Sequence, residues 1–436
     1  MPLPVVAIIG RPNVGKSTFF NRVLGTRRAV THDRPGVTRD RNAARAEWAG
    51  HAFMLVDTGG FLPAAAEGRD AEVRKQAEAA IGTADLVLFM VDALTGVTDL
   101  DNAIGHRLRR GGTPCLLVVN KVDKPGDPIA HEFHALGLGN PIPVAAEGGL
   151  GIGDLLDEVV ARLPASPPEP DEHVPRVAII GRPNVGKSSM LNALLGEERV
   201  IVEPRAGTTM DPIDARWSSS AGEFILVDTA GIRRQSQFKD QAEYFATVRA
   251  LQAMERAHVV AVMVDANEGF HKQDARLAQD ALEAGRSVLL LYNKWDQVEG
   301  REERWKTLEK ERANRYPTLG DLPAMPVSAT RGTNLHRLPR ALRQRVEEMN
   351  REIATRSLNG WMERVQKRRQ VPSDRMGRSP KIYYITQTGR RPPEFTFYVN
   401  GPDRLDTQYR RYLWLRFAEE FDFHGTPFRF RFRKSQ

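Results

Sequence analysis

The octapeptide GRPNVGKS occurs twice in this chain, at residues 10–17 and again at residues 181–188. Each copy follows an apolar run of strand length and precedes a helix-like pattern. Gly-x-x-x-x-Gly-Lys-Ser in that context is typical of a loop whose backbone N–H groups cradle phosphate, with the helix N-terminus adding partial positive charge. Two matches in the same context argue strongly against coincidence, so the chain is expected to hold two phosphate sites.

The repetition extends well beyond the octapeptide. At the same offset of 171 residues, DTGG at 57–60 matches DTAG at 228–231, and Thr38 matches Thr209. NKVD at 120–123 matches NKWD at 293–296 after two extra residues. This period is far above the 20 to 50 residues of repeat arrays, which indicates a duplicated domain.

Within each copy, buried-looking apolar runs alternate with helical patterns. That alternation predicts an α/β fold, a parallel sheet flanked by helices. Ligands of such sheets bind at the carboxyl ends of the strands, which is where all of the repeated motifs fall. The strands expected in the first copy are VVAIIG, FMLVD, LVLFMVD, CLLVVN and PIPVAA.

The length of 436 residues exceeds what one ordinary core supports, so two or three domains are expected. ASPPEPDEHVP at 165–175 is rich in proline and acidic residues and predicts a semi-extended linker. After Pro339 the sequence is expected to continue as helix into a third domain. The predicted division is a first nucleotide domain at 1–164, the linker at 165–175, a second nucleotide domain at 176–349 and a small basic α+β domain at 350–436.

The residue types in each phosphate site assign the chemistry. Lys16 and Lys187 would neutralise the β and γ oxygens of a nucleotide, and the hydroxyls of Ser17 and Ser188 would ligate Mg²⁺. The remaining expected cradle residues are Gly10, Arg11, Pro12, Asn13, Val14 and Gly15 in the first copy, and Gly181, Arg182, Pro183, Asn184, Val185 and Gly186 in the second.

Further metal and phosphate contacts are expected from the residues that follow. Asp57 and Asp228 end strands beside the same metal, although aspartate is also common as a turn residue. Gly60 and Gly231 allow a backbone N–H to approach the γ-phosphate. Thr38 and Thr209 would complete the Mg²⁺ shell, or else are ordinary loop threonines.

The Asn-Lys-x-Asp motifs indicate which purine base the bound nucleotide carries. A carboxylate can accept two hydrogen bonds from the N1–H and N2 amine of guanine, and adenine offers no such pair, so GTP and GDP are the expected nucleotides. The motif residues are Asn120, Lys121 and Asp123, and Asn293, Lys294 and Asp296.

A second guanine-contacting loop differs between the copies. PVSAT at 326–330 contains Ser328 and Ala329, whereas PVAAE at 143–147 has Ala145 where Ser328 stands. The backbone N–H of Ala146 is still expected to reach the guanine oxygen. The sequence therefore predicts a modest difference in guanine-nucleotide affinity between the two sites.

Strand, GxxxxGKS, threonine loop, DxxG and NKxD in this order resemble the Ras-like GTPases of the translation-factor class. Two such units followed by a basic module resemble a family of tandem GTPases over essentially the whole chain. The resemblance implies GTP hydrolysis, a KH-like third domain, and a role in assembly of the large ribosomal subunit through binding to that subunit, its precursor or ribosomal RNA.

The chain departs from the Ras-like pattern after DxxG. Phe61 and Ile232 stand where a water-orienting glutamine is often found. The resemblance implies that a potassium ion compensates for the missing glutamine, and Asn13 and Asn184 match the asparagine that ligates this ion in the family. Alternatively, these asparagines only stabilise the loop turn. We expect slow intrinsic hydrolysis, faster in K⁺ than in Na⁺. The residues expected to act in hydrolysis are Asn13, Lys16, Thr38 and Gly60, and Asn184, Lys187, Thr209 and Gly231.

The positive charge belongs to the C-terminal segment. Residues 351–436 contain 19 Lys and Arg against 9 Asp and Glu, while the rest of the chain is nearly balanced. Strand-like KIYYIT, FTFYV and FRFRF and two helical stretches predict an αββαβ order compatible with a small RNA-binding fold. The alternation in FRFRFR suits a half-buried edge strand or an RNA platform equally well. Without a Gly-x-x-Gly loop, binding through the usual KH groove is not expected, and a phosphate-docking surface is.

Two other functional classes stay open. One is a GTPase of membrane trafficking, which the lack of lipidation signals and of a basic amphipathic helix argues against. The other is an RNA-binding scaffold whose nucleotide sites do not turn over. No secretion signal is seen and no apolar run approaches the roughly 18 residues that span a bilayer, so a cytoplasmic, monomeric protein without stable membrane insertion is expected.

Overall fold

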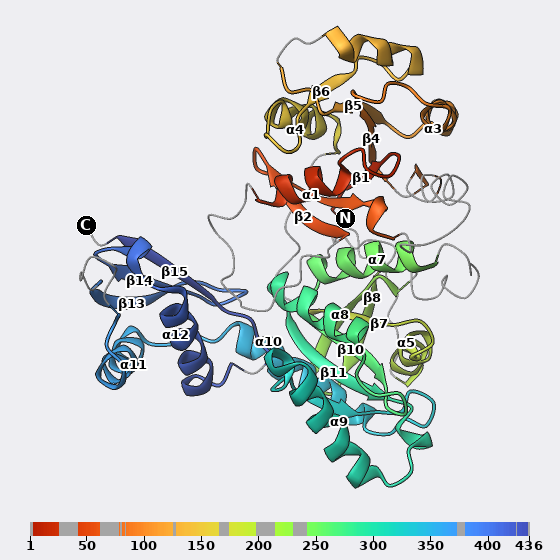
Figure 1. The fold of residues 1–436 in the computed structure, drawn as a ribbon. Helices are drawn as coiled ribbons and strands as arrows, with labels where there is room; N and C mark the ends of the chain where they lie inside the picture. The colour runs from red at the N-terminus through yellow and green to blue at the C-terminus, as the bar shows by residue number, and fades with distance from the viewer. Residues whose placement is uncertain are drawn as a thin grey trace. The chain divides into compact units, whose positions relative to one another are not determined.

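The fold is taken from a computed structural model of the chain. The described residues form two compact units. The first contains one six-stranded sheet, and the second contains another six-stranded sheet and a three-stranded sheet (Figure 1). The structure describes residues 3–25, 42–61, 78, 81–82, 84–124, 128–164, 174–197, 214–229, 242–372, 380–423 and 425–434. Most of the linker predicted at 165–175 thus lies outside the described residues.

The first sheet has the strand order β2-β3-β1-β4-β5-β6. All neighbouring pairs are parallel except β2 with β3. The strands are β1 (Val5–Ile9), β2 (Ala43–Trp48), β3 (His51–Asp57), β4 (Leu86–Asp92), β5 (Cys115–Asn120) and β6 (Ile142–Val144), and the helical segments are α1 (Lys16–Gly25), η1 (Thr58–Phe61), α3 (Asp99–Gly111), η2 (Pro128–Leu136) and α4 (Ile152–Arg162).

Both faces of this sheet are covered, which explains why its central strands are continuous apolar runs. Val5 and Ile9 of β1 belong to a core shared with Ile104 of α3. Ile8, from the opposite face of the same strand, belongs to a core shared with Phe20 of α1 and with α4. Parallel strands buried on two sides are expected to lack polar alternation, as the sequence shows.

The second sheet repeats this topology, with the order β8-β9-β7-β10-β11-β12. Its strands are β7 (Arg176–Gly181), β8 (Ala215–Ser219), β9 (Gly222–Val227), β10 (Val259–Asp265), β11 (Ser287–Asn293) and β12 (Ala324–Pro326). The helical segments in this part of the sequence are α5 (Lys187–Glu197), α7 (Ala242–Arg256), α8 (Lys272–Glu283), η3 (Trp295–Gln297), α9 (Arg301–Arg315), η4 (Pro317–Leu319), η5 (Leu335–Arg337) and α10 (Leu338–Met349). Of these, α7 belongs to the first unit as far as Gln252. The shared strand order confirms the domain duplication. No described helix of either unit is long and apolar enough to cross a bilayer.

The C-terminal part has the predicted order αββαβ. Its elements are α11 (Thr355–Arg368), β13 (Ile382–Gly389), β14 (Glu394–Val399), η6 (Pro402–Arg404), α12 (Thr407–Glu420) and β15 (Arg429–Lys434). β14 lies between β13, its antiparallel partner, and β15, its parallel partner. A core that includes Trp361, Phe395 and Phe417 joins one face of this sheet to α11 and α12.

The prediction of a continuous helix from Pro339 into the third domain is wrong. α10 ends at Met349 and α11 begins at Thr355. The backbone between them bonds to a strand residue: Ile353 N–H donates to Gln387 Oε1 at 2.9 Å, and Gln387 Nε2 donates to Arg351 O at 3.0 Å. These tertiary hydrogen bonds replace the helical ones, because buried backbone polar groups must find a partner.

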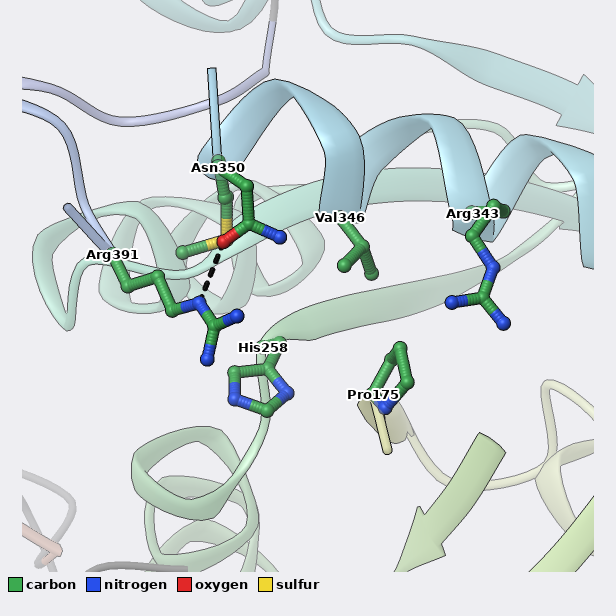
Figure 2. Close-up of a pocket in the computed structure, with 7 residues that line it drawn as sticks. Pro175, His258, Arg343, Val346, Asn350 and Arg391 are labelled. Atoms are coloured by element: carbon green, nitrogen blue, oxygen red, sulfur yellow. Dashed lines mark hydrogen bonds between the residues drawn. The ribbon is translucent and has the colours of Figure 1, made fainter. Parts of the chain in front are cut away.

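The second six-stranded sheet and the C-terminal domain are joined by direct hydrogen bonds. Val288 N–H of β11 donates to Gly425 O at 2.8 Å, and the Thr426 hydroxyl donates to Glu348 Oε2 at 2.9 Å. Nearby, Arg391 Nε donates to Asn350 Oδ1 at 2.6 Å across a small pocket (Figure 2). That pocket has a volume of about 100 Å³ and is lined by Pro175, His258, Arg343, Val346, Met349, Asn350 and Arg391.

Candidate nucleotide-binding sites

The two GRPNVGKS segments are loops of the same conformation. The first connects β1 to α1 and the second connects β7 to α5. Gly15 has φ +97°, and a Cβ on it would stand 2.1 Å from Asn120 Nδ2; Gly186 has φ +96°, and its Cβ would stand 2.3 Å from Asn293 Nδ2. Any side chain at these positions would collide with the neighbouring strand end, so glycine is required. Each loop ends at a helix N-terminus, where unpaired N–H groups favour an anion.

The loop lysines lie folded back on their own loops. Lys16 Nζ donates to Gly10 O at 2.8 Å and to Arg11 O at 2.6 Å, and Lys187 Nζ donates to Gly181 O at 2.9 Å and to the next carbonyl at 2.7 Å. Burial lowers the pKa of both lysines to about 8, and at Lys16 the nearby Asp57 carboxylate opposes that shift. A polyphosphate at the loop would supply the negative charge that these ammonium groups lack.

A hydroxyl and a carboxylate meet beside the first loop. Ser17 Oγ donates to Asp57 Oδ2 at 2.6 Å, and Gly59 N–H holds the other carboxylate oxygen at 2.9 Å. Ser188 stands near the start of α5 and Asp228 directly after β9, which are the corresponding positions of the second copy. Mg²⁺ prefers such oxygen ligands and takes few of them from the protein, so this donor set fits the metal.

Of the four other residues predicted to contact the metal or the γ-phosphate, the structure describes one. Gly60 lies in η1, directly after β3. Thr38, Thr209 and Gly231 lie outside the described residues. The structure therefore brings together the lysine, serine and aspartate of the first site, and leaves the threonine loops as predictions.

The motif asparagines join three segments in each copy. Asn120 Nδ2 donates to Val14 O at 2.7 Å, and Asn120 Oδ1 accepts from Ala146 N–H at 2.9 Å. Asn293 makes the same two bonds, with Val185 O at 2.8 Å and Ala329 N–H at 3.0 Å. Each asparagine thus ties the phosphate loop to the loop after the last strand. The N–H groups of Ala146 and Ala329 thus bind an asparagine oxygen in this structure, and the contact of Ala146 with a guanine oxygen stays a prediction.

The motif lysines are paired with buried aspartates. Lys121 Nζ lies 2.6 Å from Asp92 Oδ2, and Lys294 Nζ lies 2.7 Å from Asp265 Oδ2. Burial alone would raise the pKa of each aspartate, but hydrogen bonds from the lysine and from backbone N–H groups outweigh it and lower the pKa of both carboxyls. These ion pairs hold the motif at the carboxyl ends of adjacent strands.

The guanine-specificity aspartates differ between the copies. Ser328 Oγ donates to Asp296 Oδ1 at 2.5 Å, which fixes that carboxylate. In the first copy Ala145 offers no hydroxyl, and Asp123 is exposed. The difference seen in the sequence is therefore a difference in how firmly each carboxylate is held before nucleotide binds.

The loop asparagines, Asn13 and Asn184, have φ of +67° and +65°. Asparagine tolerates this left-handed conformation better than most residues, which accounts for its presence in the turn. Both side chains are exposed, and none of the described residues forms a hydrogen bond with either of them. The alternative of a side-chain bond that stabilises the turn thus finds no support among the described residues.

Two aspartates that bind the arginines of the phosphate loops were not identified from the sequence. Arg11 Nε donates to Asp101 Oδ1 at 3.0 Å, and Arg182 Nε donates to Asp274 Oδ1 at 3.0 Å. Both aspartate side chains are fully buried. The Thr98-x-x-Asp101 spacing, a capping box at the start of α3, was the available signal for the first aspartate.

Two family models together match most of the chain. One, described as 50S ribosome-binding GTPase, matches residues 5–121 and 176–294. The other, described as the C-terminal KH-domain-like domain of EngA bacterial GTPase enzymes, matches residues 352–433.

Similar proteins named GTPase Der match end to end. The relative from Desulforamulus reducens is 44% identical over 438 residues, covering 100% of this chain and 99% of its own length. That from Moorella thermoacetica is 44% identical over 437 residues, with 100% of both chains covered. A solved structure of Era in complex with MgGDPNP and a segment of 16S ribosomal RNA covers 60% of this chain at 24% identity with a TM-score of 0.32, a similarity too low to carry a conclusion.

Proposed function

Since the chain belongs to the GTPase Der family, we propose that it acts in assembly of the large ribosomal subunit as a switch with two guanine-nucleotide sites. The chain is a GTPase with two GTPase domains, which bind GTP, GDP and Mg²⁺. The observation that supports the proposal best is the combination of two duplicated phosphate sites with a C-terminal domain of strong positive charge. A polyanionic partner such as ribosomal RNA suits that charge.

The proposed roles within each site follow the geometry. Lys16 and Lys187 leave their loop carbonyls to bind the β and γ oxygens, while loop N–H groups donate to the other phosphate oxygens. Ser17 with Asp57, and Ser188 with Asp228, would hold Mg²⁺, which neutralises charge on the phosphates when bound. Asp123 and Asp296 accept the guanine N1–H and N2 amine.

The loops that would report the nucleotide state carry Thr38 and Thr209, with Gly60 and Gly231 after the strand aspartates. We propose that GTP orders them and that hydrolysis releases them. Domain limits at 1–164, 176–349 and 350–436 would then mark the parts that such a switch reorients. The proposed setting is the cytoplasm and the proposed state a monomer.

Potassium is the proposed activator of slow intrinsic hydrolysis. Phe61 and Ile232 cannot orient a water, so added positive charge beside the phosphates is needed. Asn13 and Asn184 offer exposed amide oxygens on the phosphate loops. Hydrolysis is expected to be faster in KCl than in NaCl, and Asn13→Ala with Asn184→Ala should remove the difference. Asn102→Ala, at an exposed position on α3, is the matched control. Equal rates of the wild type in the two salts would end the potassium proposal.

The function is tested by phosphate release and by sedimentation with ribosomal subunits. Purified protein with Mg²⁺ and K⁺ is expected to release phosphate from GTP and to co-sediment with the large subunit in one nucleotide state. GDP, a non-hydrolysable GTP analogue and no nucleotide are compared at several salt concentrations. Co-sedimentation without turnover would favour a scaffold, and flotation with liposomes in place of ribosome binding would favour the membrane class.

A further inference from the structure

The three-stranded sheet of the C-terminal domain has one face that its helices do not cover. Figure 1 shows α11 and α12 on the same side of the sheet. Phe395, Phe397 and Val399 of β14, with Phe430 and Phe432 of β15, pack in the core against these helices. The FRFRF alternation is therefore a half-buried edge strand, with its aromatics in the core. The opposite side, which we call the open sheet face, carries Tyr384, Thr386, Thr388, Glu394, Thr396, Tyr398, Arg431 and Arg433.

Aromatic rings are exposed at one end of the open sheet face. Tyr384 and Tyr398 are register partners across β13 and β14, with ring centroids 4.3 Å apart and planes 15° from parallel. In spite of this stacking, Tyr384 is 42% exposed, and its neighbour Tyr383 is 50% exposed. A register irregularity between Ile382 and Tyr384 lets both successive tyrosines avoid the core. Among large apolar residues in the described chain they form the one adjacent exposed pair.

Positively charged side chains of the neighbouring strand, β15, lie on the same face. Arg433 is the register partner of Tyr398, and Arg431 is the register partner of Thr396. Glu394 neutralises Arg431, whose Nε lies 2.7 Å from the carboxylate. Arg433 is exposed, and no described residue forms an ion pair with it. Lys381 adds a further cation, 5.5 Å from the centre of the Tyr383 ring.

The spacing of these groups suits a nucleotide chain. Adjacent strands lie about 4.8 Å apart, so a ring on one strand and a cation on the next are separated by roughly one strand spacing. Unpaired bases stack on aromatic side chains while cations contact the backbone phosphates, whereas duplex RNA hides its base faces. A partner protein would favour a dry apolar patch over rings bordered by unpaired cations. Charge and exposed rings together therefore favour single-stranded RNA.

We propose that the open sheet face binds unpaired RNA, with bases stacked on Tyr384 and Tyr398 and a phosphate held by Arg433. This inference rests on the proposed function in that RNA is its partner, and it assigns the contact to a face distinct from the groove that a Gly-x-x-Gly loop would form. Exposed Tyr383 of β13, with Lys381 just before that strand, adds a ring and a cation close to Tyr384.

The test uses the full-length protein and a fluorescein-labelled, unstructured 12-nucleotide RNA, followed by fluorescence anisotropy. Tyr384→Ala and Tyr398→Ala are each expected to weaken binding by about fivefold or more, because each removes a ring on which a base stacks. Tyr384→Phe keeps the ring and should bind like the wild type. Arg433→Gln should reduce the slope of log affinity against log salt by about one.

Matched controls lie on the helix side of the same domain. Leu415 on α12 is 47% exposed, and Leu415→Ala removes a large exposed side chain without touching the open sheet face. Arg411→Gln removes an exposed charge from the same helix. Neither control should change the affinity by more than about twofold, since single surface changes away from a contact have small effects. The far-UV circular dichroism spectrum and the thermal unfolding of every variant should match those of the wild type, which shows that the C-terminal domain is folded.

Several outcomes would overturn the proposal. The stacking platform is refuted if the wild-type protein does not bind the RNA or if the tyrosine variants bind it with unchanged affinity. It is also refuted if a blunt RNA duplex binds the wild type as tightly as the single strand does and its affinity falls as much in the tyrosine variants. Loss of ribosome binding in Tyr384→Ala with unchanged RNA affinity would assign the face to a ribosomal protein. Failure of the proposed function would look different from failure of this inference. If the proposed function is wrong, the wild type neither co-sediments with ribosomal subunits nor releases phosphate from GTP.

Discussion

Arg11 of the first phosphate loop donates from Nε to the fully buried carboxylate of Asp101 at 3.0 Å, and Arg182 binds Asp274 at the same distance in the second copy. The same carboxylate closes the start of α3, where Asp101 Oδ2 accepts from the Thr98 hydroxyl at 2.7 Å. Asp101 thus links the loop that cradles phosphate to the helix behind it. Since Lys16 Nζ rests on Arg11 O, the backbone that this pair holds also positions the loop lysine.

Asp101→Asn is expected to loosen the first phosphate loop. The change leaves a largely buried guanidinium without its anion, so the cost to stability should be about 1–3 kcal/mol. Nucleotide affinity at the first site should fall by several-fold. The measurement is titration with a fluorescent GDP analogue in an Asp296→Asn background, which leaves only the first site. Asp99→Asn, on the exposed side of the same helix turn, is the control, and equal effects of the two changes would refute a positioning role for Asp101.

The two sites should differ in affinity because only one holds its guanine-contacting aspartate in place. Ser328→Ala removes the 2.5 Å bond to Asp296 and should weaken binding at the second site by about fivefold, from a bond worth about 1 kcal/mol. Ala145→Ser is the reciprocal change and should strengthen the first site. Each variant is titrated with guanine nucleotide in a chain whose other site carries the Asp→Asn change. No change from Ser328→Ala would contradict the prediction.

The parts of the fold visible in the sequence are those in which one local signal suffices. The central strands are continuous apolar runs because both of their faces are buried, and the motifs lie at their carboxyl ends. The edge strands β2 and β8 escaped prediction. AARAEW of β2 is short, and only two of its six residues are buried, so it lacks the apolar run by which the other strands were found.

Other features depend on contacts that a linear pattern does not carry. The break between α10 and α11 is stabilised by Gln387, whose side-chain oxygen accepts the N–H of Ile353, 34 positions away in the sequence. Helix propensity alone favours continuing through this segment. Likewise Asp101 lies 90 residues from Arg11, and its local capping role gives no hint of that partner. Tertiary hydrogen bonds decide both cases.

Nucleotide binding should take up protons at alkaline pH. Burial lowers the pKa of Lys16 and of Lys187 to about 8 when no nucleotide is bound, so both are largely neutral at pH 9. A bound triphosphate favours the charged ammonium and raises these pKa values. Calorimetry in buffers of different ionisation enthalpy should then show uptake of about one proton per site at pH 9 and little at pH 7. Asp123→Asn, which disables one site, should halve the uptake at pH 9. If the wild type takes up no protons on binding nucleotide at pH 9, the prediction is refuted.

His258 should make stability fall as the solution becomes acidic. Its Nδ1 accepts the Arg176 N–H at 2.9 Å, which requires an unprotonated nitrogen. Burial, followed by the positive charges of Arg391, Arg286 and Arg176, lowers the pKa of His258 from 6.5 to about 4. His258 and Arg391 line the same pocket (Figure 2). The unfolded chain therefore binds the extra proton between pH 6.5 and 4 while the folded chain does not, so the stabilisation present above pH 6.5 is lost as the pH falls through this window.

The size of this effect can be measured by urea unfolding at pH 7, 6, 5 and 4.5. A change in pKa of this extent corresponds to about 2 kcal/mol, with allowance for a ring that is only partly buried. The asparagine of His258→Asn does not titrate. Between pH 7 and 4.5 the free energy of unfolding of this variant should therefore fall by about 2 kcal/mol less than that of the wild type. His106→Gln, an exposed position on α3, should follow the wild type. Parallel pH profiles for the wild type and His258→Asn would show that His258 does not govern the acid sensitivity of the second unit.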